Sequence, residues 1–109
     1  MRTETVLLEK QCVILLAGEI DLSTVGTLYE AVRACLDAGP TRVLIDLQEV
    51  CFCDCVGLRA LLQAKEEILR AGACFGIHGP LRPLVARLVE RTHTADRLGL
   101  APASPEEPV

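Results

Sequence analysis

The sequence predicts an α/β domain: a mostly parallel sheet of four to five strands, with an antiparallel edge strand, packed against three or more helices. Two observations predict it. Short apolar runs of strand length alternate along the chain with longer stretches whose apolar residues recur at helical spacing. Strands that alternate with helices return to one sheet through right-handed crossovers. With 109 residues, half of them hydrophobic, the chain suits a single domain, expected over residues 1–100.

Two consecutive strands are expected first. Residues Thr3–Lys10 show a short mixed pattern, and Cys12–Ile20 form the β-branched and aliphatic run CVILLAGEI. A polar turn near Lys10 and Gln11 would make the pair antiparallel. Gly18, close to the end of the second run, indicates a β-bulge or a close approach of the backbone.

A first helix is expected over residues 24 to 38. Ser23 is a candidate N-cap, and Gly39 followed by Pro40 ends the helix, because glycine adopts the left-handed conformation there and proline cannot continue the ladder. Gly26 weakens this helix by roughly 1 kcal/mol relative to alanine. The apolar residues share one stripe: Val25, Leu28, Val32, Cys35 and Leu36.

The stretch VCFCDCVGLRALL, residues 50–62, is the centre of the predicted fold. Before it, Thr41–Leu47 form an apolar run that ends at a polar Gln-Glu pair, a pattern typical of a strand covered on both faces. Within residues 50–62 an apolar strand runs into a helix through Asp54, Cys55 and Gly57. The chain therefore makes a strand-to-helix turn at this point.

A second helix follows and ends at Gly72, and its apolar residues share one face: Leu58, Leu61, Leu62, Ile68 and Leu69. Residues 73–79, ACFGIHG, predict another short strand. A third helix follows, with Pro83 tolerated in its first turn. Residues 92–100 fit either a short turn or an edge strand.

Charge and hydropathy exclude several classes of partner. The formal net charge is −4, and no run of Lys or Arg could neutralise a track of phosphates, so no nucleic-acid partner is expected. Glu4 and Glu9 interrupt any signal-peptide pattern, and no apolar run approaches the roughly 20 residues that span a bilayer. We expect a cytoplasmic protein without membrane association. The tail, residues 101–109, is rich in Pro and Glu and is predicted to be disordered.

Six cysteines raise the question of a disulfide framework or a metal site. Most lie among Val, Leu and Ala, where a reduced cysteine behaves as a small hydrophobe, so we expect reduced, mostly structural thiols. The alternative is a thiol-based redox or metal-responsive module that uses Cys51, Cys53 and Cys55. Alternate residues of a strand lie roughly 6.5 to 7 Å apart on one face, which does not favour closure on a single zinc ion. No metal site is predicted.

No enzymatic signature is found. His78 and His93 are isolated in sequence, and each is expected to be a surface or loop residue. The segment GIHG lacks the glycine spacing and the following Lys-Ser/Thr of a phosphate loop. We expect neither catalysis nor a cofactor.

Three segments resemble the STAS domain of anti-sigma factor antagonists and sulfate transporter tails: GEIDLST at 18–24, VLIDL at 43–47, and V-x-F-x-D-x-x-G-L at 50–58. The resemblance implies a small sheet backed by helices. It also implies partner switching, in which the protein binds an anti-sigma factor that is a serine kinase and thereby releases a sigma factor. An alternative is a scaffold subunit of a larger STAS-type assembly. A monomer or weak dimer is expected.

The resemblance places the family's phosphorylated serine at Cys55, between Asp54 and Gly57. Because a thiol is a poor acceptor for a kinase built around a hydroxyl, binding is expected without phosphorylation at this position. Asp21 and Asp54 each follow a strand, so they are either local helix caps or part of the binding surface, and the two roles are compatible. The predicted partner-binding residues are Asp21, Leu22, Ser23, Thr24, Asp54, Cys55, Val56, Gly57 and Leu58.

Overall fold

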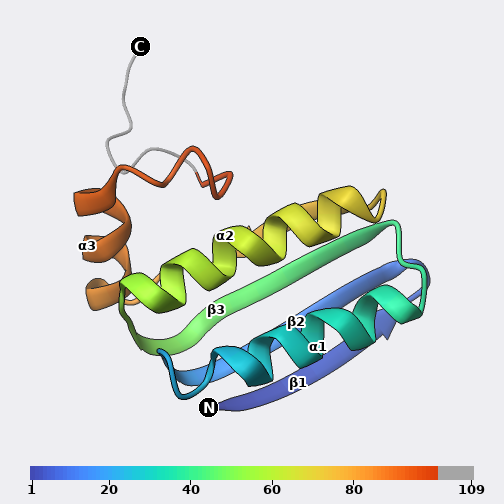
Figure 1. The fold of residues 1–109 in the computed structure, drawn as a ribbon, viewed down its shortest axis with the longest axis horizontal. Coiled ribbons are helices and arrows are strands. Elements are labelled where there is room, and N and C mark those ends of the chain that lie inside the picture. Colours follow the sequence, from blue (N-terminus) through green and yellow to red (C-terminus); the bar gives the residue numbers. More distant parts are fainter. Residues whose placement is uncertain (101–109) are drawn as a thin grey trace.

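The computed structural model describes residues 1–100 as one mixed four-stranded sheet with three helices (Figure 1). The predicted disordered tail, residues 101–109, lies outside the described residues. The elements in chain order are β1 Arg2–Leu8, β2 Gln11–Ile20, α1 Val25–Asp37, β3 Arg42–Cys53, α2 Cys55–Arg70, β4 Cys74–His78 and α3 Pro83–Thr92. Strand order is β1-β2-β3-β4; β1 is antiparallel to β2, and the other pairs are parallel. The predicted fold class, including the antiparallel edge strand, is confirmed.

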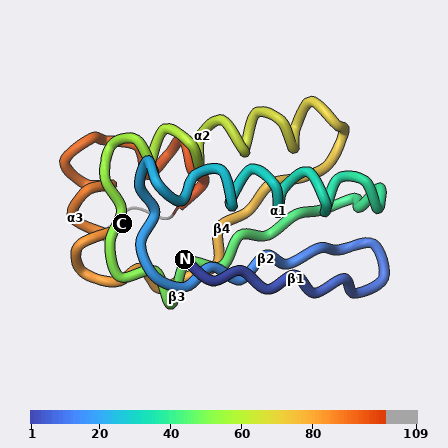
Figure 2. Tube along the Cα trace, turned by 60° about the horizontal axis from the view of Figure 1, so that its bottom comes forward, coloured from blue at the N-terminus to red at the C-terminus, as the bar shows by residue number. Residues whose placement is uncertain are grey.

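Helices α1 and α2 both lie on one face of the sheet, while α3 lies at the end where β2 and β3 finish (Figures 1 and 2). Alternate residues of the central strands point into this helix layer and are buried, as are the residues that face them from α1 and α2: Cys12, Ile14, Leu16, Val43, Ile45, Leu47, Leu28, Val32, Leu61, Ala64 and Ile68. The core is therefore aliphatic.

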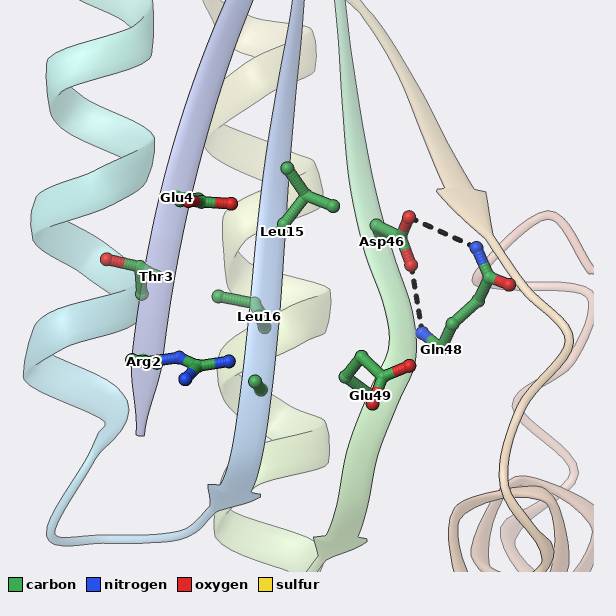
Figure 3. Close-up of a pocket in the computed structure, with 9 residues that line it drawn as sticks. Arg2, Thr3, Glu4, Leu15, Leu16, Asp46, Gln48 and Glu49 are labelled. Carbon is green, nitrogen blue, oxygen red and sulfur yellow. Dashed lines mark hydrogen bonds between the residues drawn. The ribbon is translucent and has the colours of Figure 1, made fainter.

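The opposite face of the sheet is not covered by a helix. Figure 3 looks onto it and shows Arg2, Glu4 and Leu15 beside Asp46 and Glu49, which line a shallow pocket. The prediction that the third strand is covered on both faces is wrong, because both crossover helices of β2–β3–β4 lie on the same side.

Strand β3 is longer than predicted, since it continues through the polar pair that was expected to end it. Its register against β2 shifts between Leu15 and Ala17 and again between Gly18 and Glu19, and each shift leaves an extra residue on β3. The first bulge takes Gln48 out of the ladder. Its N–H donates to Asp46 Oδ1 at 2.9 Å, and its carbonyl accepts from Arg82 Nε at 3.0 Å. Both backbone groups are satisfied outside the sheet, so the strand continues without an orphaned polar group.

Several local predictions are confirmed. The first two strands turn at Glu9 and Lys10, where Glu9 has a positive φ of 56°, and Gly18, with φ 108°, lies at the second register shift. Helix α1 ends at Asp37 before Gly39, and α3 has Pro83 in its first turn.

In the C-terminal half, one residue differs from its prediction and one segment with two predicted alternatives is now described. Leu69 was placed on the buried face of the second helix but is 50 % exposed, because it lies to one side of the buried stripe formed by Leu61, Ala64 and Ile68. Residues 93–100 form turns, with Leu98 buried in the core. Within residues 1–100, no helix is long and apolar enough to cross a bilayer.

The cysteines differ most from expectation. Cys12 on β2 and Cys35 on α1 form a disulfide with a Cα–Cα separation of 6.3 Å, whereas reduced thiols were expected. Both residues are buried, 1 % and 2 % exposed, and they face each other across the helix–sheet interface. The sequence places each on an apolar stripe, but their pairing depends on how α1 packs on β2. Cys51, Cys53, Cys55 and Cys74 are free thiols.

The first turn of α2 packs directly on the end of β2 at Gly57. A Cβ atom built at this position would overlap the carbonyl oxygen of Ile20 and lie 2.8 Å from Ile20 Cγ2. Only glycine allows this approach, because the obstructing atoms include backbone that cannot move aside. Gly57 therefore sets the distance between α2 and β2.

Gly57→Ala is expected to lower the free energy of unfolding by about 1–3 kcal/mol, the range of overpacking in a core. Gly26→Ala is the matched control, because nothing lies within 4 Å of its added Cβ and the site is helical. It should stabilise the protein by about 1 kcal/mol. Urea unfolding followed by circular dichroism measures both, and equal effects of the same sign would contradict the role given to Gly57.

Candidate functional site

The candidate site lies at the carboxyl ends of the two central strands. Ile20, the last residue of β2, is the Cα partner of Cys53, the last residue of β3. The Asp54 N–H donates to the Ile20 carbonyl at 3.3 Å, which joins the β2–α1 loop to the β3–α2 turn. The two segments lie side by side at the lower left of Figure 1. The predicted proximity of Asp21 and Asp54 is thus confirmed: they follow paired residues on neighbouring strands.

Asp54 is the N-cap of α2. Its backbone is extended (φ −102°, ψ −173°), and its Oδ1 accepts from the Gly57 N–H at 2.8 Å. This carboxylate satisfies one of the free N–H groups of the first turn and is favoured by the helix dipole. The cap role considered for Asp54 is present, and it fixes where Cys55 and Val56 begin the helix.

The β2–α1 loop is organised differently from the prediction. Ser23 was expected to cap the first helix, but Thr24 occupies the N-cap position without a side-chain cap bond. The carbonyl of Asp21 accepts from the N–H groups of Thr24 and Val25, both at 3.0 Å, so the helix begins one residue later than expected. The Ser23 hydroxyl instead donates to Asp21 Oδ1 at 2.6 Å.

Asp21 organises this loop through its carboxylate. Oδ1 accepts from both the hydroxyl and the N–H of Ser23, the latter at 3.0 Å. The hydrogen bond from the Ser23 side chain lowers the pKa of Asp21 below its ordinary value, opposed by desolvation and assisted by further bonds from Ser23 and Thr24. A lowered pKa means that the loop is stabilised above the ordinary carboxyl pKa and loses this contribution as pH falls through the folded value.

Around these two loops, side chains of several kinds reach solvent. Leu22 is 75 % exposed, Val56 42 % and Phe52 38 %, and Ser23 and Cys55 are exposed beside them in the chain. We call these five residues the carboxyl-edge surface. Exposed large apolar side chains gathered at one edge, rimmed by carboxylates, are typical of interaction sites.

Two predicted binding residues lie beneath this surface. Gly57 and Leu58 are buried, Leu58 being 5 % exposed and part of the core. The backbone of Gly57 and the side chain of Leu58 support the surface from below rather than form it. Phe52 was not among the predicted binding residues, although it lies within the V-x-F-x-D segment. Alternation from the buried residues Val43, Ile45 and Leu47 already predicts that Phe52 lies on the other face of β3, where it is 38 % exposed.

The three clustered cysteines lie in different surroundings. Cys51 is the extra residue of the second bulge; it is exposed, and its Sγ lies 3.5 Å from the Gly18 carbonyl oxygen. Cys53 is buried, and burial, with smaller effects of Asp54 and Cys55, raises the pKa of its thiol to about 12. Cys55 is exposed on α2. Within the described chain, no three His, Cys, Asp or Glu side chains are grouped as metal ligands.

Comparison with known proteins identifies a matching family and a named relative. Residues 4–100 match the family described as Mlab, STAS domain. The anti-sigma-F factor antagonist RsfB of Mycobacterium tuberculosis is 41 % identical over 56 residues. These cover 51 % of this chain and 46 % of RsfB, so the chain matches about half the length of this relative.

Solved structures share the fold over almost the whole chain. An anti-sigma factor antagonist from Mycobacterium paratuberculosis superposes with a TM-score of 0.77 and 27 % identity, covering 94 % of this chain and 86 % of that one. The anti-sigma factor antagonist SpoIIAA in its unphosphorylated form superposes with a TM-score of 0.72 and 16 % identity, covering 94 % and 90 %. The second likeness concerns the fold alone.

The cysteine surroundings predict an alkylation pattern. With iodoacetamide at pH 8 and no reductant, Cys51, Cys55 and Cys74 should react readily, while buried Cys53 reacts at least about tenfold more slowly because its thiol stays protonated. Peptide mass mapping against time measures this. Unfolding in urea without reductant should expose Cys53 to alkylation. Cys12 and Cys35 should stay unmodified, since a disulfide joins them. Alkylation of Cys12 or Cys35 under those conditions would contradict the disulfide.

Proposed function

The chain belongs to the STAS domain family, and from this premise we propose that it acts as an anti-sigma factor antagonist. In this proposal it binds an anti-sigma factor of the serine-kinase type and so releases a sigma factor. It acts in the cytoplasm as a monomer or weak dimer, as a binding protein without a cofactor of its own. ATP belongs to the partner.

The observation that carries the proposal is the carboxyl-edge surface. Leu22, Phe52 and Val56 supply exposed apolar area. Asp21 and Asp54 are fixed beside them by hydrogen bonds of 2.6 Å and 2.8 Å. A preorganised edge of this kind lowers the entropy lost on binding, because the loops are already ordered. The similarity to named antagonists supports the choice of partner class.

Cys55 is the exposed residue at the position that the family resemblance assigns to the phosphorylated serine. In this proposal its thiol is not phosphorylated, so the partner's kinase does not regulate binding through α2. The residue still occupies the first turn of α2, where it contributes to contact with the partner. The family match over residues 4–100 includes this turn, and in this proposal the thiol changes the regulation of the turn but not its geometry.

Val56→Glu is expected to weaken binding to the anti-sigma factor by at least about tenfold, because it puts a charge into the apolar part of the contact. A carboxylate in the first turn of α2 is favourable to the helix itself, so the fold should persist. Titration calorimetry with the anti-sigma factor recovered by pull-down from the native cell measures the change in Kd.

Leu69→Glu is the matched control for Val56→Glu. Leu69 is an equally exposed apolar residue of the same helix, 50 % against 42 %, but it lies near the opposite end. Its substitution should leave the Kd unchanged. Equal weakening by both variants would argue against this surface, and recovery of no kinase-type anti-sigma factor at moderate salt would count against the proposed function as a whole.

Cys55→Ser is expected to make the α2 turn phosphorylatable by an active partner kinase, because it supplies a hydroxyl in an otherwise matching turn. Incubation with the partner and Mg-ATP, followed by peptide mass mapping, should place a phosphoryl group on position 55. In the wild-type protein, the peptide that contains Cys55 provides the comparison and should carry no phosphoryl group. An unmodified position 55 in the variant would contradict the match between this position and the phosphorylated serine of the family.

A further inference from the structure

The hydroxyl groups of Ser23 and Thr24 both lie just after the carboxyl end of β2, and they differ in how far hydrogen bonds occupy them. Thr24 Oγ1 is engaged inside the loop: it donates to the Glu19 carbonyl at 2.9 Å and accepts from the Asp21 N–H at 2.9 Å. The Ser23 side chain is exposed, and its hydroxyl donates only to Asp21 Oδ1. The Ser23 oxygen thus keeps its lone pairs toward solvent, which is the requirement for attack on an incoming phosphoryl group.

Ser23 is also distinguished by the composition of the chain. It is the only serine in residues 1–100; the other serine of the sequence is Ser104. Ser23 follows Ile20, whose carbonyl accepts from the Asp54 N–H, so it lies on the loop that adjoins the turn carrying Cys55. A serine kinase bound to the carboxyl-edge surface therefore meets one serine hydroxyl there, and it is on the neighbouring loop.

We propose that Ser23 is the phosphoacceptor of this protein, modified by the kinase activity of its anti-sigma factor partner; this inference rests on the proposed function. Ser23 Oγ attacks the γ-phosphorus of Mg-ATP, the bond from that phosphorus to the β,γ-bridging oxygen breaks, and ADP leaves. The hydroxyl proton passes to a carboxylate base of the kinase. The products are ADP and phosphorylated Ser23, so atoms and charge balance.

Phosphorylation at Ser23 changes the conformation of the β2–α1 loop as well as its charge. The proton that joins Ser23 Oγ to Asp21 Oδ1 at 2.6 Å is lost, and a group carrying about −1.5 to −2 charges takes its place next to an ionised carboxylate. Repulsion between these anions opens the Asp21–Ser23 turn. Leu22 lies between the two residues, so its exposed side chain moves with them. The modification therefore acts on both the polar and the apolar part of the carboxyl-edge surface.

The test uses the full chain, the anti-sigma factor recovered by pull-down, and Mg-ATP. Peptide mass mapping should find one phosphoryl group on Ser23, and the phosphorylated protein should bind the partner at least about tenfold more weakly than the unmodified protein. Ser104→Ala is the control variant and should be phosphorylated and released as the wild type is. Ser23→Ala should acquire no phosphate, and its Kd should not respond to ATP.

The outcomes separate the two proposals. A complex that forms but carries no phosphate on Ser23, or carries it on another residue, overturns this inference and leaves the proposed function standing. Failure of every variant to form a complex overturns both. Ser23→Glu tests the effect of charge without the kinase. The variant should have the same unfolding midpoint as the wild type and should bind the partner at least about tenfold more weakly. Undiminished binding would contradict the charge mechanism.

Discussion

The contact between Gly57 and Ile20 is the constraint on which the site depends. Parallel pairing brings the ends of β2 and β3 together, but pairing alone does not set how closely α2 approaches. Because Gly57 has no Cβ, the first turn of α2 rests on the backbone of Ile20, and the Asp54 N–H can reach the Ile20 carbonyl. The cap formed by Asp54 holds the same turn from its other side. The two loops are therefore joined at one edge of the sheet, although they are far apart in the sequence.

Much of this fold could be predicted from the sequence because its main signals are local. The apolar runs, the stripe of α1, and the stops at Gly39 and Gly72 each depend on neighbours within a few residues, and they are sufficient to define the element order. The proximity of Asp21 and Asp54 could also be predicted, since carboxyl ends of parallel strands share one edge. Local patterns and topology together thus predict where the site lies.

The remaining features depend on contacts between elements, which a periodic pattern does not encode. At the first bulge of β3, Asp46 on the same strand and Arg82 at the start of α3 satisfy the backbone of Gln48. The Cys12–Cys35 pair depends on the packing of α1 over β2. In the β2–α1 loop, the Ser23 hydroxyl donates to Asp21, and Thr24 is the residue at the cap position. The bulge and the disulfide involve partners on other elements, whereas the position of the α1 cap is decided within the loop itself.

The carboxyl-edge surface and the two carboxylates beside it respond in opposite ways to added charge. Apolar contacts by Leu22, Phe52 and Val56 gain from the exclusion of water, whereas Asp21 and Asp54 already concentrate negative charge at the same edge. A partner that binds here must place cationic or donor groups near the carboxylates. Added dianionic charge then raises the cost of desolvation and repels the fixed carboxylates at short range, where screening by salt is least effective. The proposed phosphorylation of Ser23 would act on this edge from the β2–α1 loop, whereas Cys55 on the neighbouring turn supplies no hydroxyl for it.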